Sequence, residues 1–187
     1  MQLRIKDAPA QEVLGAARRF APICAAHRAL FILNDRPDLV APAGADGVHL
    51  GQEDAPVDEA RALLGADRLI GLSTHTPEQV DGASGADYIG VGPVHATPTK
   101  PGRPAVGAEL VRYAASHAAV PFFAIGGIDP GNVEDVCAAG ARRVAVVRSL
   151  TEANDPESTA RALRRAVERA AAVDRGATAE EVRVGPA

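Results

Sequence analysis

The sequence has few of the features that would assign it to a membrane protein or a nucleic-acid-binding protein. No apolar run approaches the ~20 residues of a membrane-spanning helix, and the N-terminus lacks the charged-then-apolar pattern of a signal peptide. Acidic residues exceed basic ones only slightly, with 24 Asp and Glu against 20 Lys and Arg. That balance is too mild for binding nucleic acid or an acidic membrane by bulk electrostatics. We therefore expect a cytoplasmic protein in which any anion binding is local.

Cysteine is also scarce, and the histidines form no recognisable catalytic arrangement. Cys24 and Cys137 each lie in an Ala-rich stretch without a second Cys or His at metal-ligand spacing, so we expect two buried free thiols. His49 lies within an apolar run, and His75 and His95 follow two others, but none of the three has a Ser or Cys nucleophile arrangement beside it. The sequence thus offers no nucleophilic triad.

Short apolar runs alternate regularly with longer amphipathic stretches. The runs are bounded by Gly, Pro, Asp or Asn and predict buried strands, whereas the Ala-rich stretches predict helices. The predicted strands cover residues 2–5, 29–33, 47–50, 69–72, 88–91, 122–125 and 143–147. The predicted helices cover residues 8–26, 56–64, 77–84, 108–116, 132–139 and 156–172. Regular βα alternation predicts a parallel sheet.

A repeated Gly-Ala-Asp triplet supports this alternation. Copies begin at Gly44, Gly65 and Gly85, and a related Gly-Ala-Arg triplet begins at Gly140. Each copy is expected to end a helix and lead into an apolar run, where glycine supplies the left-handed helix stop. The spacing between the first three copies is the length of a compact strand-plus-helix unit.

Seven consecutive units fit an α/β fold of the TIM (β/α)8 barrel type that lacks its first βα unit, rather than an open doubly wound sheet. The chain begins inside a predicted strand, so either one unit has been lost or the start codon lies further upstream. We expect one N-terminally truncated barrel domain over residues 1–173 and a flexible polar tail over residues 174–187.

Polar side chains in the first predicted strand suggest an anion site. Gln2, Arg4 and Lys6 alternate with apolar residues, and the two-residue period of a strand puts them on one face. Two cations directed into a barrel would be costly to desolvate unless an anion met them. The alternative is an exposed edge strand.

Two aspartates, Asp35 and Asp54, follow the next two predicted strands. Mg²⁺ in proteins usually keeps waters and takes one or two carboxylates together with substrate phosphate oxygens, so the pair is a candidate magnesium site. The alternative is that Asp54 caps the helix near Pro56 and that Asp35 only closes a turn.

A second anion site is expected after the later strands. The segment 93–104 is long for a loop between tight βα turns and contains Thr97, Thr99 and Lys100, whose hydroxyls and charge suit phosphate. A solvated, proline-stiffened loop is the alternative. The turn at Gly127 and the end of the run at Arg148 stand where barrels commonly bind phosphate.

The motifs together resemble those of the thiamine phosphate synthase family. They are Gln2-Leu3-Arg4-Ile5-Lys6, Asn34-Asp35-Arg36, Val48-His49-Leu50-Gly51-Gln52-Glu53-Asp54, Gly92-Pro93 with Thr97-Pro98-Thr99-Lys100, and Ile125-Gly126-Gly127-Ile128. The resemblance runs from Gln2 to about residue 171. It implies a Mg²⁺-dependent transferase of an alkyl group other than methyl. Such an enzyme condenses hydroxymethylpyrimidine pyrophosphate with hydroxyethylthiazole phosphate, giving thiamine monophosphate and pyrophosphate.

The resemblance also implies roles for individual residues. The pyrimidine pyrophosphate would be held by Gln2, Arg4, Lys6, Asn34 and Lys100, with Asp35 and Asp54 on Mg²⁺ and Ser73 near the pyrimidine. The thiazole phosphate would be held by Thr97, Thr99 and Gly127 and by the backbone near Val147 and Arg148. Arg4, Lys6 and Lys100 would act in catalysis. Pyrophosphate would leave first, giving a pyrimidinylmethyl cation that the thiazole nitrogen attacks, so no covalent nucleophile is needed.

The sequence departs from the family pattern in three places. No βα unit stands before Gln2, Arg148 replaces a small residue, and His95 replaces an aromatic one. Two alternatives stay open: a thiazole tautomerase-like isomerase, which uses a histidine where Pro93 stands, and a non-catalytic phosphate-binding remnant. The expected partners are the two small-molecule substrates, without nucleic acid or membrane, and with a homodimer as an open alternative.

Overall fold

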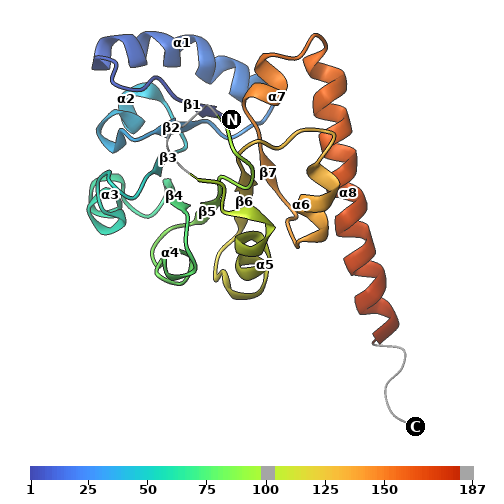
Figure 1. Ribbon diagram of the computed structural model, residues 1–187. Helices are drawn as coiled ribbons and strands as arrows, with labels where there is room; N and C mark the ends of the chain where they lie inside the picture. The colour runs from blue at the N-terminus through green and yellow to red at the C-terminus, as the bar shows by residue number, and fades with distance from the viewer. Residues whose placement is uncertain (98–103, 182–187) are drawn as a thin grey trace. The chain divides into compact units, whose positions relative to one another are not determined.

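The computed structural model describes residues 1–97 and 104–181, with side chains described as far as residue 173. Within these ranges, seven strands form one sheet in chain order, from β1 to β7, with helices between them (Figure 1). The strands are β1 Gln2–Leu3, β2 Ile32–Asn34, β3 Gly47–Leu50, β4 Leu69–Thr74, β5 Tyr88–Val91, β6 Phe122–Ile125 and β7 Val144–Ala145. The parallel pairing of β1 to β4 and of β6 with β7 confirms the predicted α/β class.

Helices follow almost every strand. They are α1 Ala10–Ala26, α2 Val40–Ala43, α3 Val57–Leu64, α4 Pro77–Asp81, α5 Gly107–His117, α6 Val133–Ala138, α7 Arg148–Thr151 and α8 Pro156–Glu181, with a 3-10 helix η1 Pro37–Leu39. None of the helices in the described ranges combines the length and apolar character needed to span a membrane.

The chain divides into two compact units, and β5 contributes residues to both. The first unit comprises residues 1–74 and 83–89. Its core includes Phe31, Leu33, Val48, Leu50 and Ile70, each at most 2% exposed. These side chains come from the strands and from the residue before β2, so apolar burial of roughly 2 kcal/mol per large side chain holds the strands together.

The second unit comprises residues 75–82 and 90–187. Val111, Ala124, Val133, Val136 and Leu163 form much of its core and bring together α5, β6, α6 and α8. The helix α8 carries the last of these residues, so its amphipathic face closes this core.

The repeated triplet has a structural role in the first unit. Asp46 and Asp87 are the last residues of two copies, and their carboxylates accept the N–H of Phe31 and of Ile70, both at 2.7 Å. The backbone N–H groups of the same aspartates donate to the carbonyls of the same residues, at 2.7 and 2.8 Å. Each aspartate therefore locks its own strand onto the amino end of the strand before it.

The triplet glycines adopt positive φ angles as predicted, with 66° at Gly44, 76° at Gly65, 84° at Gly85 and 105° at Gly140. Gly85 does not end a helix, however, because α4 ends earlier, at Asp81. The prediction of a helix stop at Gly85 is wrong.

Both terminal strands are shorter than predicted. β1 ends at Leu3, so Arg4 and Lys6 follow the strand, and Asp7 turns the chain with a φ of 59°. β7 ends at Ala145, because Leu150 and Thr151 already donate N–H bonds to the Val147 carbonyl and start α7. The predicted strand 143–147 therefore extends one residue before β7 and two residues beyond it.

The last predicted helix is longer than expected. α8 continues to Glu181, and so includes residue 174, where the sequence predicts the start of a tail. Residues 182–187 lie outside the described ranges, and the tail stays a prediction.

Candidate functional site

The predicted pyrophosphate residues of the first unit lie in β1 and β2 or directly after β1. Gln2 Nε2 donates to Asn34 Oδ1 at 2.7 Å. The parallel register pairs Gln2 with Ile32, and the long Gln2 side chain reaches forward to the end of β2. The structure therefore brings together two of the residues that the family resemblance assigns to one anion.

Arg4 and Lys6 are exposed, while Leu3 and Ile5 between them pack against the core of the first unit. The alternation predicted from the sequence thus persists beyond the end of β1. Neither cation forms an ion pair with another described residue. Two positive charges are consequently available to an anion, although β1 is also the first strand in the sheet order, as the edge-strand alternative requires.

Asp35 and Asp54 stand after the neighbouring strands β2 and β3. Asp35 has a φ of 62°, which Asp tolerates better than most residues, and its N–H donates to the His49 carbonyl at 2.9 Å. Asp54 Oδ2 accepts the N–H of Gly51 at 2.6 Å. The helix α3 begins without a side-chain cap, so the alternative in which Asp54 caps it is wrong.

The donor set fits Mg²⁺. Two carboxylates are the hard oxygen ligands that this ion prefers. No cluster of three or more His, Cys, Asp or Glu suited to a metal occurs in the described part of the chain. A Mg²⁺ ion held by Asp35 and Asp54 would therefore complete its shell with water and ligand phosphate oxygens.

Ser73 is held in a line of hydrogen-bonded side chains that the sequence does not reveal. His49 Nδ1 lies 3.1 Å from the Tyr88 hydroxyl, and His49 Nε2 lies 3.0 Å from Ser73 Oγ. Gln52 Nε2 donates to the Ser73 carbonyl at 2.6 Å. Ser73 is 8% exposed, so its hydroxyl is positioned by these neighbours rather than by solvent.

Glycine at position 71 makes room for this arrangement. A Cβ atom added to Gly71 would lie 2.2 Å from Tyr88 Cζ and 2.5 Å from His49 Nδ1. Real atoms do not approach so closely, so any larger residue would displace the Tyr88 ring or the His49 ring. His49 stands opposite Gly71 in the register of β3 and β4, and this cross-strand pairing is what the sequence cannot show directly.

In the second unit, the predicted phosphate turn requires glycine for reasons of space and backbone conformation. Gly126 and Gly127 have φ angles of 107° and 62°. An added Cβ would lie 2.5 Å from Pro93 at Gly126 and 2.7 Å from the His95 Cβ at Gly127. Asn132 Nδ2 donates to the Gly127 carbonyl at 2.8 Å, which fixes the peptide. The turn is therefore rigid and presents bare backbone.

The structure describes Thr97, which is half-buried, whereas Thr99 and Lys100 lie outside the described ranges. Next to Thr97, the chain is tied to the Gly turn, because Val94 and His95 donate N–H bonds to the carbonyls of Ile125 and Gly126, at 2.9 and 3.0 Å. Thr97 is thereby carried by a segment that packs directly on the turn.

Arg148 is turned away from a phosphate role. Its guanidinium forms two hydrogen bonds with Glu152, at 2.7 and 2.8 Å, and its side chain is 47% exposed. The hydrogen bond with Glu152 raises the pKa of Arg148, and the same bond lowers the pKa of Glu152. The positive charge is thus already compensated. Val147, at the N-cap of α7, is also exposed.

Two buried polar atoms of the second unit have no hydrogen-bond partner among the described residues: His95 Nε2 and Ser149 Oγ. Native proteins rarely leave such atoms unpaired, so each needs an explanation, and a ligand is one. His95 contacts Gly127, and Ser149 follows β7, the strand beside β6.

Hydrogen bonds hold both the backbone and the ring of His75. Its Nδ1 lies against the carbonyl of Gly92, and its backbone N–H donates to Gln79 Oε1 at 2.7 Å. These bonds hold the start of α4, which suggests a structural role.

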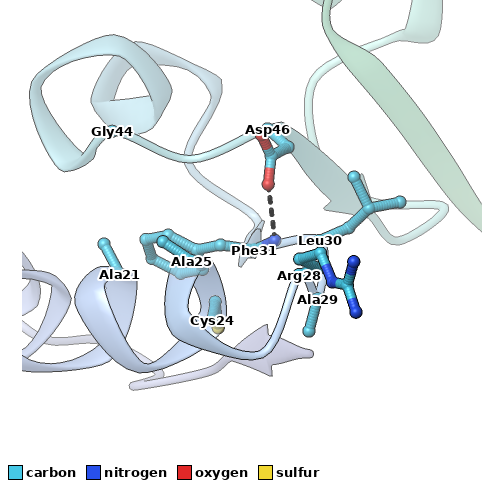
Figure 2. A pocket seen from close by; sticks show the side chains of 9 residues that line it. All are labelled: Ala21, Cys24, Ala25, Arg28, Ala29, Leu30, Phe31, Gly44 and Asp46. Atoms are coloured by element: carbon cyan, nitrogen blue, oxygen red, sulfur yellow. Dashed lines mark hydrogen bonds between the residues drawn. The ribbon is translucent and has the colours of Figure 1, made fainter.

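The first unit also has a pocket of about 290 Å³ between α1 and the starts of β2 and β3. Figure 2 shows Asp46 reaching the Phe31 N–H beside it. The pocket lies at the amino ends of these strands, whereas Asn34 and Asp35 lie at the carboxyl end of β2. In parallel α/β folds ligands bind at the carboxyl ends, so this pocket is not part of the candidate site.

Parallel strands in chain order, with polar residues gathered after their carboxyl ends, are typical of enzymes of the (β/α)-barrel class. Comparison with known proteins agrees. A solved structure, the thiamine phosphate pyrophosphorylase from Pyrococcus furiosus, superposes with a TM-score of 0.82 at 33% identity, covering 90% of this chain and 82% of that one.

The family model described as thiamine monophosphate synthase matches residues 1–150. Thiamine-phosphate synthase of Gloeobacter violaceus is 56% identical over 161 residues, and that of Thermus thermophilus is 52% identical over 167 residues. The matches cover 85% and 88% of this chain, and 47% and 80% of the two relatives. The chain belongs to the thiamine monophosphate synthase family, and it spans about half the length of the Gloeobacter relative.

Proposed function

We propose that the chain is a thiamine phosphate synthase, which condenses hydroxymethylpyrimidine pyrophosphate with hydroxyethylthiazole phosphate and releases pyrophosphate. The observation that carries this proposal is the arrangement on β1 and β2: the Gln2 amide donates to Asn34, and two exposed cations, Arg4 and Lys6, follow β1. This is a donor set for a polyanion, contributed by neighbouring strands.

Bond cleavage in the proposed reaction needs charge compensation rather than a nucleophile. The C–O bond to the pyrimidine methylene breaks, and its electron pair leaves with pyrophosphate. Arg4 and Lys6 would compensate the charge that grows on the leaving oxygen. Mg²⁺, held by Asp35 and Asp54, would supply further electrostatic stabilisation when bound. We propose Lys100 for the same role.

The second substrate would be held through its phosphate. The groups that would bind this phosphate are the turn at Gly127, the hydroxyls of Thr97 and Thr99, and the backbone at Val147 and Arg148. Ser149 Oγ is a better candidate for binding this phosphate than the Arg148 guanidinium. Ser149 Oγ has no hydrogen-bond partner among the described residues, whereas Arg148 is paired with Glu152. Binding would orient the thiazole nitrogen, whose lone pair forms the new C–N bond.

Pyrophosphate release by the purified 187-residue chain tests the proposal. We expect release only when the pyrimidine pyrophosphate, the thiazole phosphate and Mg²⁺ are all present. Release without the thiazole phosphate would indicate a hydrolase instead. Absence of release, with both phosphorylated compounds still bound, would favour the non-catalytic phosphate-binding alternative.

A thiazole tautomerase activity is disfavoured by Pro93, which has no group for proton transfer at the position where that isomerase uses a histidine. The cytoplasmic location, the homodimer and the absence of nucleic-acid and membrane partners stay predictions.

A further inference from the structure

Three side chains from three consecutive strands, Tyr88, His49 and Ser73, form a continuous hydrogen-bonded line within the first unit. His49 lies in β3, Ser73 in β4 and Tyr88 in β5. Nothing in the proposed chemistry uses His49 or Tyr88. The line nevertheless ends on the hydroxyl assigned to the pyrimidine.

Close packing leaves the rings of Tyr88 and His49 little room to move. The Tyr88 and His49 rings lie with their centroids 5.4 Å apart, and Gly71 leaves the space they occupy. The carbonyl of Ser73 is held by Gln52, so the remaining freedom at Ser73 is the direction of its hydroxyl proton.

Tyr88 stays a neutral phenol. Burial, with a smaller contribution from the Asp87 carboxylate, raises its pKa above the ordinary value. A neutral imidazole has one N–H and one acceptor nitrogen. When a phenol donates to Nδ1, the ring proton must lie on Nε2, and Nε2–H then donates to Ser73 Oγ.

We propose that His49 and Tyr88 are positioning residues that set the direction of the Ser73 hydroxyl. Tyr88 donates to His49, His49 donates to Ser73 Oγ, and the Ser73 O–H is left to donate to a ring nitrogen of an aminopyrimidine. This inference rests on the proposed function for the identity of the ring. It gives a role to His49, which the proposed chemistry does not otherwise use.

Ligand binding tests the inference without requiring turnover. Titration calorimetry would compare the pyrimidine pyrophosphate with inorganic pyrophosphate, which lacks the ring. Because one hydrogen bond is lost, Tyr88→Phe should weaken binding of the pyrimidine pyrophosphate about fivefold and leave the affinity for inorganic pyrophosphate unchanged. Tyr113→Phe is the matched control, because Tyr113 also donates its hydroxyl, to Asp81 at 2.6 Å, but on the exposed surface.

A double-mutant cycle separates positioning from general stability. If Tyr88 acts through Ser73, then Tyr88→Phe combined with Ser73→Ala should bind the pyrimidine pyrophosphate no more weakly than Ser73→Ala alone. Fully additive losses, or equal losses for both ligands, would overturn the inference while leaving pyrophosphate release by the wild-type chain, and hence the proposed function, intact.

The tautomer of His49 gives a readout independent of any substrate. Nitrogen-15 NMR of the wild-type chain should show His49 protonated on Nε2, and Tyr88→Phe should convert this to a mixture of tautomers. Protonation on Nδ1 in the wild type would overturn the proposed direction. A wild type that binds the pyrimidine pyrophosphate without releasing pyrophosphate would contradict the proposed function only. A wild type that binds no pyrimidine pyrophosphate would contradict both.

Discussion

The candidate sites of the two units differ in the partners of their buried or partly buried polar groups. In the first unit, Asn34, Asp54 and Ser73 each have a side-chain or backbone partner within the protein. In the second unit, His95 Nε2 and Ser149 Oγ are buried without one among the described residues. These three side chains of the first unit are thus positioned before a ligand binds, whereas in the second unit a ligand would complete the hydrogen bonding of His95 and Ser149.

The two candidate sites also differ in whether side chains or bare backbone would contact a ligand. The candidate site of the first unit consists mostly of side chains directed by strand alternation. That of the second depends on Gly126 and Gly127, where any side chain would collide with its neighbours. Side chains suit a shaped heterocycle and a metal, and bare peptide groups suit a phosphate.

The largest effect should come from Asp54 in the first unit. Asp54→Ala removes one of two proposed magnesium ligands, and we expect Mg²⁺-dependent pyrophosphate release to fall by about 100-fold or more. Asp58→Ala, an exposed position in the first turn of α3, is the control. Unchanged turnover in Asp54→Ala would remove the metal assignment.

A substitution at Gly127 should affect the second unit alone. Gly127→Ala combines an unfavourable φ with a close contact to His95, so we expect a loss of about 2 kcal/mol in folding stability or phosphate binding. The KM for the thiazole phosphate should rise, and that for the pyrimidine pyrophosphate should not. Gly15→Ala, in an open helical position, should instead stabilise the chain by about 0.5 kcal/mol or more. Equal changes in both KM values would contradict the assignment of the Gly127 turn to the thiazole phosphate alone.

The aspartate lock predicts a purely structural effect in the first unit. Asp46→Ala leaves the Phe31 N–H without its carboxylate, and urea unfolding should show a loss of about 1–2 kcal/mol. Asp67, the same residue of the middle triplet copy, is exposed and has no such bond, so Asp67→Ala should change little. Similar losses at both positions would mean that the carboxylate bond is not the cause.

The smallest effects are expected from substitutions of two adjacent residues of α7, Arg148 and Ser149. Ser149→Ala should weaken binding of the thiazole phosphate about fivefold, the effect expected from the loss of one hydrogen bond. Arg148→Ala should change binding less than about twofold, because exposed ion pairs contribute little. Binding of the thiazole phosphate by calorimetry would decide, and the reverse order of effects would restore Arg148 as the phosphate cation.

Much of the fold is readable from local sequence. The runs at 47–50, 88–91 and 122–125 coincide with β3, β5 and β6. Strand pairing is what local patterns do not contain, and the line from Tyr88 to Ser73 exists only through pairing. Its signals in the sequence were a histidine within an apolar run and a glycine two residues before Ser73. Neither is informative until the register places His49 opposite Gly71.

The site residues differ in the same way. Asp35 and Asp54 were predictable because Asp35 directly follows β2 and Asp54 lies in the loop after β3, although the Gly51 contact of Asp54 was not. The side-chain role of Arg148 could not be judged from sequence, since its partner Glu152 stands one turn further on, at the C-cap of a helix that is itself unpredicted.

The aspartate locks at the amino ends of the strands also act as a check on alignment. In a parallel sheet, a slip of one residue turns every side chain to the opposite face. A slipped β2 and β3 would leave the Asp46 carboxylate and the Phe31 N–H without each other. Asp46 and Asp87 stand just before their own strands, so a register slip is destabilised by the hydrogen bonds lost there. The correct register therefore does not depend on the residues that would bind substrate, which lie at the other ends of the strands.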